Sequence, residues 1–323
     1  MSPLQFEQRH AAEWAALEAA LDALENRNKG ADAAAAARGY RRVCEQLAVA
    51  RSRAYPLHLA ERLDTLAQRA HRLLYRERPA FGEGLRRLLL VSFPRTLRAE
   101  WKLVWLATVA FVGPLVAAYA ATRWDPAFAL GVMDTRTLSN FDSMYGDGTD
   151  AIGRLRDAET DWQMFGFYIR NNISVAFQCF ATGLTAGIGS LFFLVYNGLL
   201  AGAVAGYLDT RGLGHNFWPF VATHAAFELT AIVISGAAGL MLGRALLAPG
   251  RLTRGEALRE AGRGAAVRIA GAALMLVVAA VLEAFWSSAA WVPPAAKFGV
   301  AALCWAGVLG FLWRAGRGSG DAR

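Results

Sequence analysis

The sequence predicts an all-α protein, a polytopic helical membrane protein with an N-terminal cytoplasmic helical domain. The first observation is composition: 55% of the 323 residues are hydrophobic and 19% are charged, whereas soluble domains average about 45–50% and about 25%. The second is that long uncharged runs begin only after residue 100. The third is that arginines gather beside these runs, which is typical of charges that orient a chain in a membrane.

Residues 1–80 are predicted to form a small helical bundle or hairpin on the cytoplasmic side. Apolar residues recur at spacings of three and four over residues 4–27, again over 33–55, and again after Pro56. This spacing places them on one face of each helix. Packing within a helical core accounts for nearly all of them.

Residues 81–100 are predicted to form an interfacial amphipathic helix before the first crossing. Their apolar side chains share one face, and basic side chains beside it suit anionic lipid headgroups. The predicted headgroup contacts are Arg86, Arg87, Arg95 and Arg98. An ordinary helix of the bundle remains the alternative.

The first transmembrane helix is predicted at residues 101–121, because one crossing needs about 20 apolar residues. Residues 122–170 are net acidic and rich in loop residues, so they are predicted to form an extracytoplasmic loop. Residues 171–314 are predicted to form a bundle of about five further segments. Residues 315–323 would then be a cytoplasmic tail.

Residues 173–208 carry no charge and leave the number of crossings ambiguous. The stretch is too long for one crossing and tight for two. The basic segments 76–102, 244–268 and 314–323 are expected inside, and the loop 122–170 outside. Parity then requires residues 173–208 to cross twice or to form a re-entrant hairpin. We expect six membrane segments with both termini in the cytoplasm.

An intramembrane polar site is predicted around His224 and Glu228. Their spacing of four places both on one face of a helix, and ionisable side chains inside a membrane are costly unless paired or facing water. Either the two satisfy each other and lock the bundle, or they form a proton or ligand site. Asn171, Asn172 and Asn197 are added as polar candidates, with a structural role at helix breaks as their alternative.

Glu283 is expected to reach the outer interface, although it could instead face inward near Glu228. No metal site and no cofactor are expected, since no HExxH or second HxxxH motif completes a ligand set. Enzymatic activity is not expected either, because P-loop, GxSxG and GxGxxG signatures are missing. Intramembrane hydrolysis would need a second catalytic group near His224.

Two glycine series are predicted to let helices approach closely. They are Gly198, Gly202 and Gly206, and Gly236, Gly239 and Gly243. These faces also leave homo-oligomerisation open. The net charge of +8 does not indicate nucleic-acid binding, because the arginines lie beside hydrophobic segments.

Five elements resemble the stage II sporulation protein M family of bacterial membrane proteins. They are the N-terminal pattern Phe6…Arg9…Trp14…Leu17, FPRTLR at Phe93–Arg98, and the more specific NNISVAF from Asn171, NGLLAGAVAGY from Asn197 and THAAFELTAIVISGAAGLMLG at Thr223–Gly243. The resemblance covers most of the chain and is weakest over 122–170. Ala225 follows the histidine where the family commonly has glycine.

The resemblance implies a membrane-embedded scaffold or anchor at the bacterial cytoplasmic (inner) membrane. The sporulation member anchors peptidoglycan-degrading partners during engulfment, and relatives are often encoded near an AAA+ ATPase. Expected partners are therefore membrane lipids and membrane or cytoplasmic proteins, with an AAA+ ATPase as one candidate, in a role linked to cell-envelope remodelling. The alternative is a transporter or channel for a small solute or ion that uses His224 and Glu228.

Overall fold

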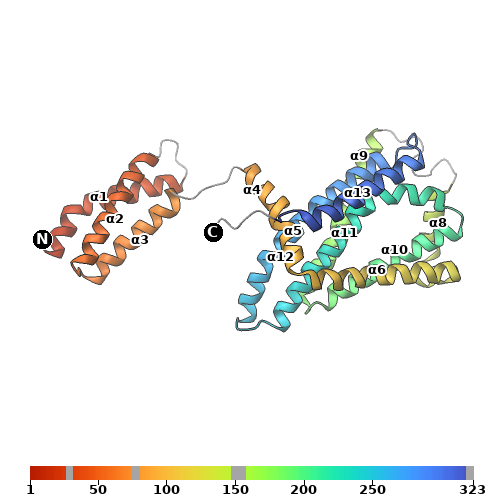
Figure 1. Ribbon diagram of the computed structural model, residues 1–323, viewed down its shortest axis with the longest axis horizontal. Helices are drawn as coiled ribbons and strands as arrows, with labels where there is room; N and C mark the ends of the chain where they lie inside the picture. Colours follow the sequence, from red (N-terminus) through yellow and green to blue (C-terminus); the bar gives the residue numbers. More distant parts are fainter. Residues whose placement is uncertain (27–31, 75–80, 147–157, 318–323) are drawn as a thin grey trace. The chain divides into compact units, whose positions relative to one another are not determined.

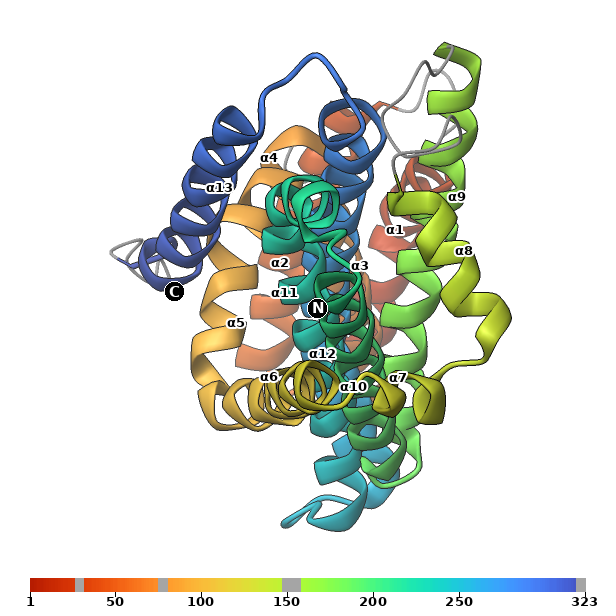
Figure 2. The same ribbon diagram turned by 90° about the vertical axis from the view of Figure 1, so that its right-hand side faces the viewer.

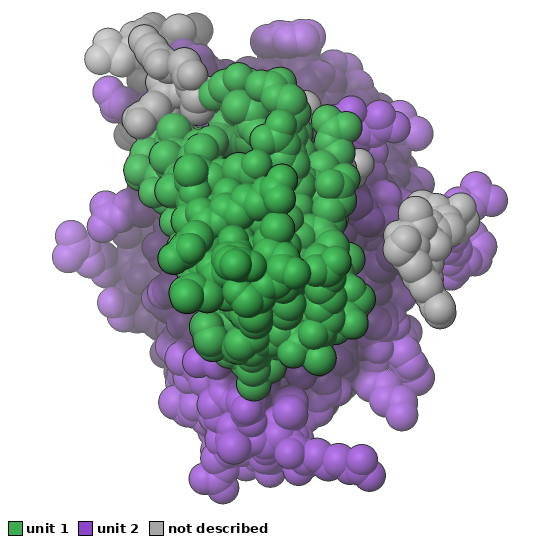
Figure 3. Space-filling model, turned by 90° about the vertical axis from the view of Figure 1, so that its left-hand side faces the viewer, with its two compact units in different colours: residues 1–82 green, residues 83–323 purple. Residues whose placement is uncertain are grey.

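The computed structural model describes residues 1–26, 32–74, 81–146 and 158–317, and every regular element in these ranges is a helix (Figure 1 and Figure 2). The predicted all-α fold is confirmed. The chain divides into two compact units, residues 1–82 and 83–323 (Figure 3). Parts of the predicted domain 1–80, of the predicted loop and of the predicted tail lie outside the described residues.

The first unit is a bundle of three helices with its own apolar core. They are α1 (Pro3–Glu25), α2 (Ala33–Ser52) and α3 (Leu57–Leu74). Ser2 caps α1 in a capping box with Gln5, and Asp32 accepts from the first backbone N–H groups of α2. The core follows the predicted periodicity, with Trp14, Leu21 and Leu63 fully buried.

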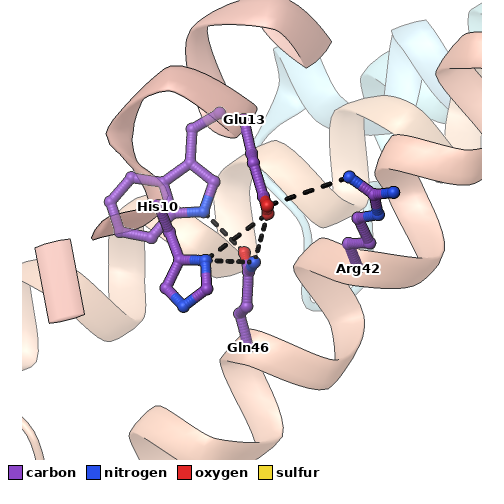
Figure 4. Close-up of polar contacts among 5 residues, drawn as sticks. His10, Glu13, Arg42 and Gln46 are labelled. Carbon is purple, nitrogen blue, oxygen red and sulfur yellow. Dashed lines mark hydrogen bonds and ion pairs between the residues drawn. The ribbon is translucent and has the colours of Figure 1, made fainter. Parts of the chain in front are cut away.

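A polar network joins α1 to α2 beside this core (Figure 4). Gln46, which is buried, accepts from Trp14 Nε1 at 2.6 Å and donates from Nε2 to Glu13 Oε2 at 2.8 Å. The same amide nitrogen lies 2.9 Å from His10 Nδ1, and Arg42 lies 3.8 Å from Glu13. The Gln46 hydrogen bond lowers the pKa of Glu13. A buried amide with these partners carries little desolvation cost.

Five helices in the described part of the second unit are long and apolar enough to cross a membrane. They are α6 (Trp101–Trp124), α10 (Ile188–Thr210), α11 (Gly214–Leu247), α12 (Arg254–Val281) with its π-helical extension η3 (Leu282–Ser287), and α13 (Pro294–Arg314). The most buried of them is α11, which packs against each of the other four. The chain is thus a multi-pass membrane protein.

A sixth long helix, α9 (Ala158–Ala181), packs on α11 but is less apolar than these five. Polar residues in its middle, Arg170, Asn171 and Asn172, reduce its hydropathy. A tight turn with a short helix, η2 (Thr182–Leu184), connects it to α10. Residues 173–208 therefore contain the second half of α9, this turn and most of α10. A crossing by α9, and with it the total of six, stays a prediction.

Helical structure extends into the predicted loop 122–170 from both ends. The first crossing continues to Trp124, and α9 begins at Ala158. Between them lie α7 (Ala127–Val132) and α8 (Thr135–Tyr145). Because α8 is amphipathic, it buries Leu138 and Tyr145 in the same apolar cluster as α10 and α11. The side of the membrane on which these helices lie stays a prediction.

Residues 81–100 are helical, but two of their four arginines bond protein carbonyls. The segment runs through α4 (Phe81–Arg87), the π-helical turn η1 (Leu88–Ser92) and α5 (Phe93–Ala99). Arg95 donates to Gly316 O at 2.8 Å, and Arg98 donates to Leu312 O and Ala315 O at 2.7 and 2.6 Å. These carbonyls lie at the end of α13, where a helix has unpaired acceptors and a partial negative charge. The sequence predicted lipid headgroups as the partners of Arg95 and Arg98. The pattern of charges along the chain does not show that the end of a distant helix lies beside them.

Glycines let α10 lie directly against α6, as the spacing predicts. A Cβ atom added at Gly198 would lie 2.1 Å from the carbonyl oxygen of Phe111, and one at Gly202 would lie 2.1 Å from that of Leu115. On α11, a Cβ atom at Gly239 would lie 2.2 Å from Ser190 Oγ. These glycines are therefore required by backbone contact between helices.

The start of α6 is tied to the end of α11 by an ion pair. Both guanidinium nitrogens of Arg244 donate to the carboxylate of Glu100, at 2.6 and 2.7 Å. The hydrogen bonds from Arg244 hold the pKa of Glu100 below its usual range. This bidentate pair places Arg244 at one boundary of the apolar bundle.

Candidate functional site

A buried polar cluster forms where α11 meets η3 and the first turn of α13. His224 and Glu228 project from α11, Glu283 and Ser287 come from η3, and Lys297 comes from α13. Here α11 packs against both η3 and α13, and the hydrogen bond from Lys297 to Ser287 connects η3 to α13. The cluster therefore joins three elements that are separate in sequence.

His224 is held by contacts on both sides of its ring. It is 3% exposed, and its Nδ1 lies 3.1 Å from Ser287 Oγ. Its Nε2 lies 3.9 Å from Glu228 Oε2, which is too long for a hydrogen bond. The ring of Phe220 stands edge-on to the imidazole at 5.4 Å. His224 and Glu228 are thus neighbours, as predicted from their spacing, without a direct hydrogen bond.

Glu283 faces this cluster, which corrects the expectation that it reaches the outer interface. It is 9% exposed, and ligand atoms of His224, Glu228 and Glu283 all lie within 4.8 Å of one another. The reason is the π-helical turn at Leu282–Ser287, which changes the angular spacing of side chains relative to an α-helix. An α-helical extrapolation from the preceding residues therefore gives the wrong direction for this side chain.

The same network includes three residues that the sequence patterns did not single out, Ser287, Lys297 and Thr223. Lys297 Nζ donates to Ser287 O at 2.7 Å, and Thr223 Oγ1 donates to Lys297 O at 3.2 Å. All three are buried. Lys297 is the single charged residue in the apolar run 296–313, and such an isolated charge is itself a signal of an interior polar site.

An aromatic layer of side chains from α8 and α11 lies at this end of the bundle. The ring of Tyr145 stands edge-on to Phe217 at 5.3 Å and to Phe220 at 6.1 Å. Burial raises the pKa of Tyr145, and the negative charge of Glu283 raises it further. Tyr145 thus lies close enough to the cluster to sense its carboxylates.

The three predicted asparagines have different surroundings. Asn197 Nδ2 donates to Phe193 O of its own helix at 2.7 Å. Asn171 donates to Asn172 Oδ1 at 3.0 Å, and the buried Asn172 Nδ2 has no hydrogen-bond partner among the described residues. The hydrogen bonds of the described chain do not connect any of the three to His224. They are not shown to share its site.

The position of the cluster along α11 predicts that it is near one boundary of the membrane core. His224 stands 20 residues before Arg244 on α11, which is about 30 Å along a helix, equal to the thickness of a bilayer's hydrocarbon core. Since Arg244 marks the boundary predicted to be cytoplasmic, the cluster is expected near the opposite, extracytoplasmic boundary.

Chemically, the cluster offers one imidazole nitrogen and two carboxylates at close range. These groups are suited to share protons or to hold a cation, because carboxylates so close together inside a low-dielectric region are unfavourable when both are charged. The hydrogen bond to Ser287 leaves Nε2 of His224 on the side of Glu228. The tautomer with the proton on Nδ1 therefore directs the lone pair of Nε2 into the cluster.

Comparisons with known proteins match the two units separately. A family model described as Stage II sporulation protein M matches residues 104–288, more than half of the chain. A second, described as Domain of unknown function (DUF8413), matches residues 4–76. No curated protein and no solved structure matches the chain. The first match includes His224, Glu228, Glu283 and Ser287.

Proposed function

Because the chain belongs to the stage II sporulation protein M family, we propose that it is a membrane-embedded scaffold or anchor that recruits partner proteins at the bacterial inner membrane. A link to cell-envelope remodelling is part of this proposal. The partners would be membrane or cytoplasmic proteins, and the resemblance makes an AAA+ ATPase one candidate. Arg86 and Arg87, which are exposed on α4, would contact anionic lipid headgroups.

The observation that carries the proposal is the independent first unit. Residues 1–82 form a compact body with its own core, and residues 4–76 match a domain model of their own. Ion pairs such as Arg69 with Glu25 and Arg51 with Asp64 connect its helices. A domain that completes its own packing leaves its surface for other molecules, and this one precedes the helices of a membrane protein.

A groove of about 360 Å³ between α1 and α2 is the surface of this domain that we propose for partner contact. Its lining includes small residues, among them Ala12, Ala16 and Gly39, and charged residues such as Arg38 and Glu13. Small lining residues leave room for a partner's side chains, and the charged residues can select among partners.

Deleting residues 1–80 is expected to abolish capture of the partner while leaving membrane insertion intact. The measurement is affinity purification from detergent-solubilised membranes of the native bacterium, with quantitative mass spectrometry. Ala16→Arg, which fills the groove, should reduce capture at unchanged expression. Ala15→Arg, on the same helix and exposed outside the groove lining, is the matched control. An unchanged set of captured proteins after the deletion would refute the scaffold role.

The alternative, an ion or solute transporter, is favoured by one observation, the grouping of buried His224 and Glu283 with partly buried Glu228 within the membrane unit. If the protein transports ions through this cluster, liposomes containing it should show a pH-dependent flux that Glu228→Gln abolishes. The deletion of residues 1–80 should leave that flux unchanged. Absence of flux through the wild-type protein would count against transport without bearing on the scaffold role.

A further inference from the structure

The polar cluster brings two carboxylates and an imidazole together inside the membrane unit. A carboxylate transferred from water to such surroundings needs a counter-charge, a proton or several hydrogen bonds. Glu228 and Glu283 face the same small space as His224. Any occupant of that space must therefore compensate up to two negative charges.

We propose that His224, Glu228 and Glu283 bind a divalent first-row metal cation of the Zn²⁺ or Mn²⁺ class. A neutral imidazole nitrogen and two carboxylate oxygens are ligands that such ions accept. A divalent cation would offset the charges of the two carboxylates, which lowers the cost of burying them. This proposal does not depend on the scaffold role.

The distances are close to those that coordination requires. Two ligand atoms that each lie about 2.0–2.2 Å from one ion stand at most about 4.4 Å apart. The ligand atoms of the three residues lie within 4.8 Å of one another, and His224 Nε2 and Glu228 Oε2 are 3.9 Å apart. Small side-chain rotations would close the site, without movement of the helices.

The surroundings of His224 also match a metal ligand. A metal-bound histidine commonly donates its second ring N–H to a polar group, which fixes the tautomer and the ring orientation. Here Nδ1 lies 3.1 Å from Ser287 Oγ, and Nδ1–H can donate to it. Ser287 is positioned in turn by the hydrogen bond from Lys297 to its carbonyl. The ring is thus oriented with Nε2 toward the Glu228 carboxylate.

The route of entry follows from the depth of the cluster. It lies near the boundary that the arginine distribution assigns to the extracytoplasmic side, beneath the aromatic layer that includes Tyr145 and Phe220. Metal would therefore reach the site from outside the cytoplasm. Once bound, it would connect α11 to the end of α12 through η3.

The test uses the full-length protein in detergent, with any affinity tag removed and bound metal stripped by a chelator. After dialysis against Zn²⁺ or Mn²⁺ and gel filtration, elemental analysis should find about one ion per chain. Glu283→Gln, which keeps the shape of the side chain and removes its charge, should lose the ion. His215→Gln, at an exposed histidine outside the cluster, should keep it.

Absence of a stoichiometric ion in the wild-type protein would overturn the proposal and favour protonated carboxylates. Retention of the ion by a folded Glu283→Gln would overturn it as well. If that variant does not fold, as judged by its elution and helicity, Ser287→Ala tests the proposal instead. Removal of an orienting hydrogen bond is expected to lower the metal affinity about 10–100-fold. Unchanged affinity in Ser287→Ala would then refute the site.

Discussion

Replacing Gly202 with alanine is expected to disrupt the packing of α10 on α6 and to destabilise the membrane unit. The new Cβ would lie 2.1 Å from the carbonyl oxygen of Leu115, which belongs to the backbone and has no rotamer with which to move away. Overpacking of this kind costs about 1–3 kcal/mol and sometimes more. Thermal unfolding in detergent, followed by circular dichroism, measures the effect.

Gly113→Ala is the matched control, because it makes the same substitution within α6 where no atom lies within 4 Å of the new Cβ. Alanine is favoured over glycine in helix interiors by roughly 1 kcal/mol in water, so this variant is expected to be as stable as the wild type or slightly more so. Equal melting temperatures for the two variants would show that Gly202 is not needed for close backbone contact between α6 and α10.

Leu63→Ala is expected to unfold the N-terminal domain while the membrane unit stays folded. Leu63 is completely buried in the three-helix core, and removing a buried leucine side chain costs about 2–5 kcal/mol. A core of this size rarely supplies more than about 3–5 kcal/mol, so the change removes most of the domain's stability. Limited trypsin digestion of the full-length protein should then cleave within α2 and α3.

Leu57→Ala provides the comparison, since Leu57 is 72% exposed at the start of the same helix. Its digestion pattern should match that of the wild type. Partner capture should fall with Leu63→Ala and not with Leu57→Ala if the folded domain is the recruiting element. Equal resistance of both variants to trypsin would show that the three-helix core is not the main source of this domain's stability.

The partners of the arginines at residues 81–100 could be predicted only in part, because two of these arginines contact a distant part of the chain. Their pattern beside an apolar face is the same for a helix on a lipid surface and for one that caps another helix. Arg95 and Arg98 find carbonyls at the end of α13, more than 200 residues away in sequence. Only the packing of α5 beside α13 selects between these partners.

Only part of the polar cluster could be predicted from the sequence. Helix geometry explains which residues were placed together and which were not. His224 and Glu228 share one regular helix, so their spacing of four was sufficient to place them together. Glu283 lies on a different element, in a π-helical turn whose position no local residue pattern predicts. Lys297 and Ser287 enter through contacts between η3 and α13.

The sequence by itself determined the all-α class, the membrane location, the glycine contacts and the family, because apolar run length, helical periodicity and motif order are local properties of the chain. The tertiary structure alone decided that two arginines cap α13 and that Glu283 faces His224. Each of these depends on which helices lie side by side. That arrangement is set by the complementary shapes of distant surfaces, which hydropathy and charge along the chain do not encode.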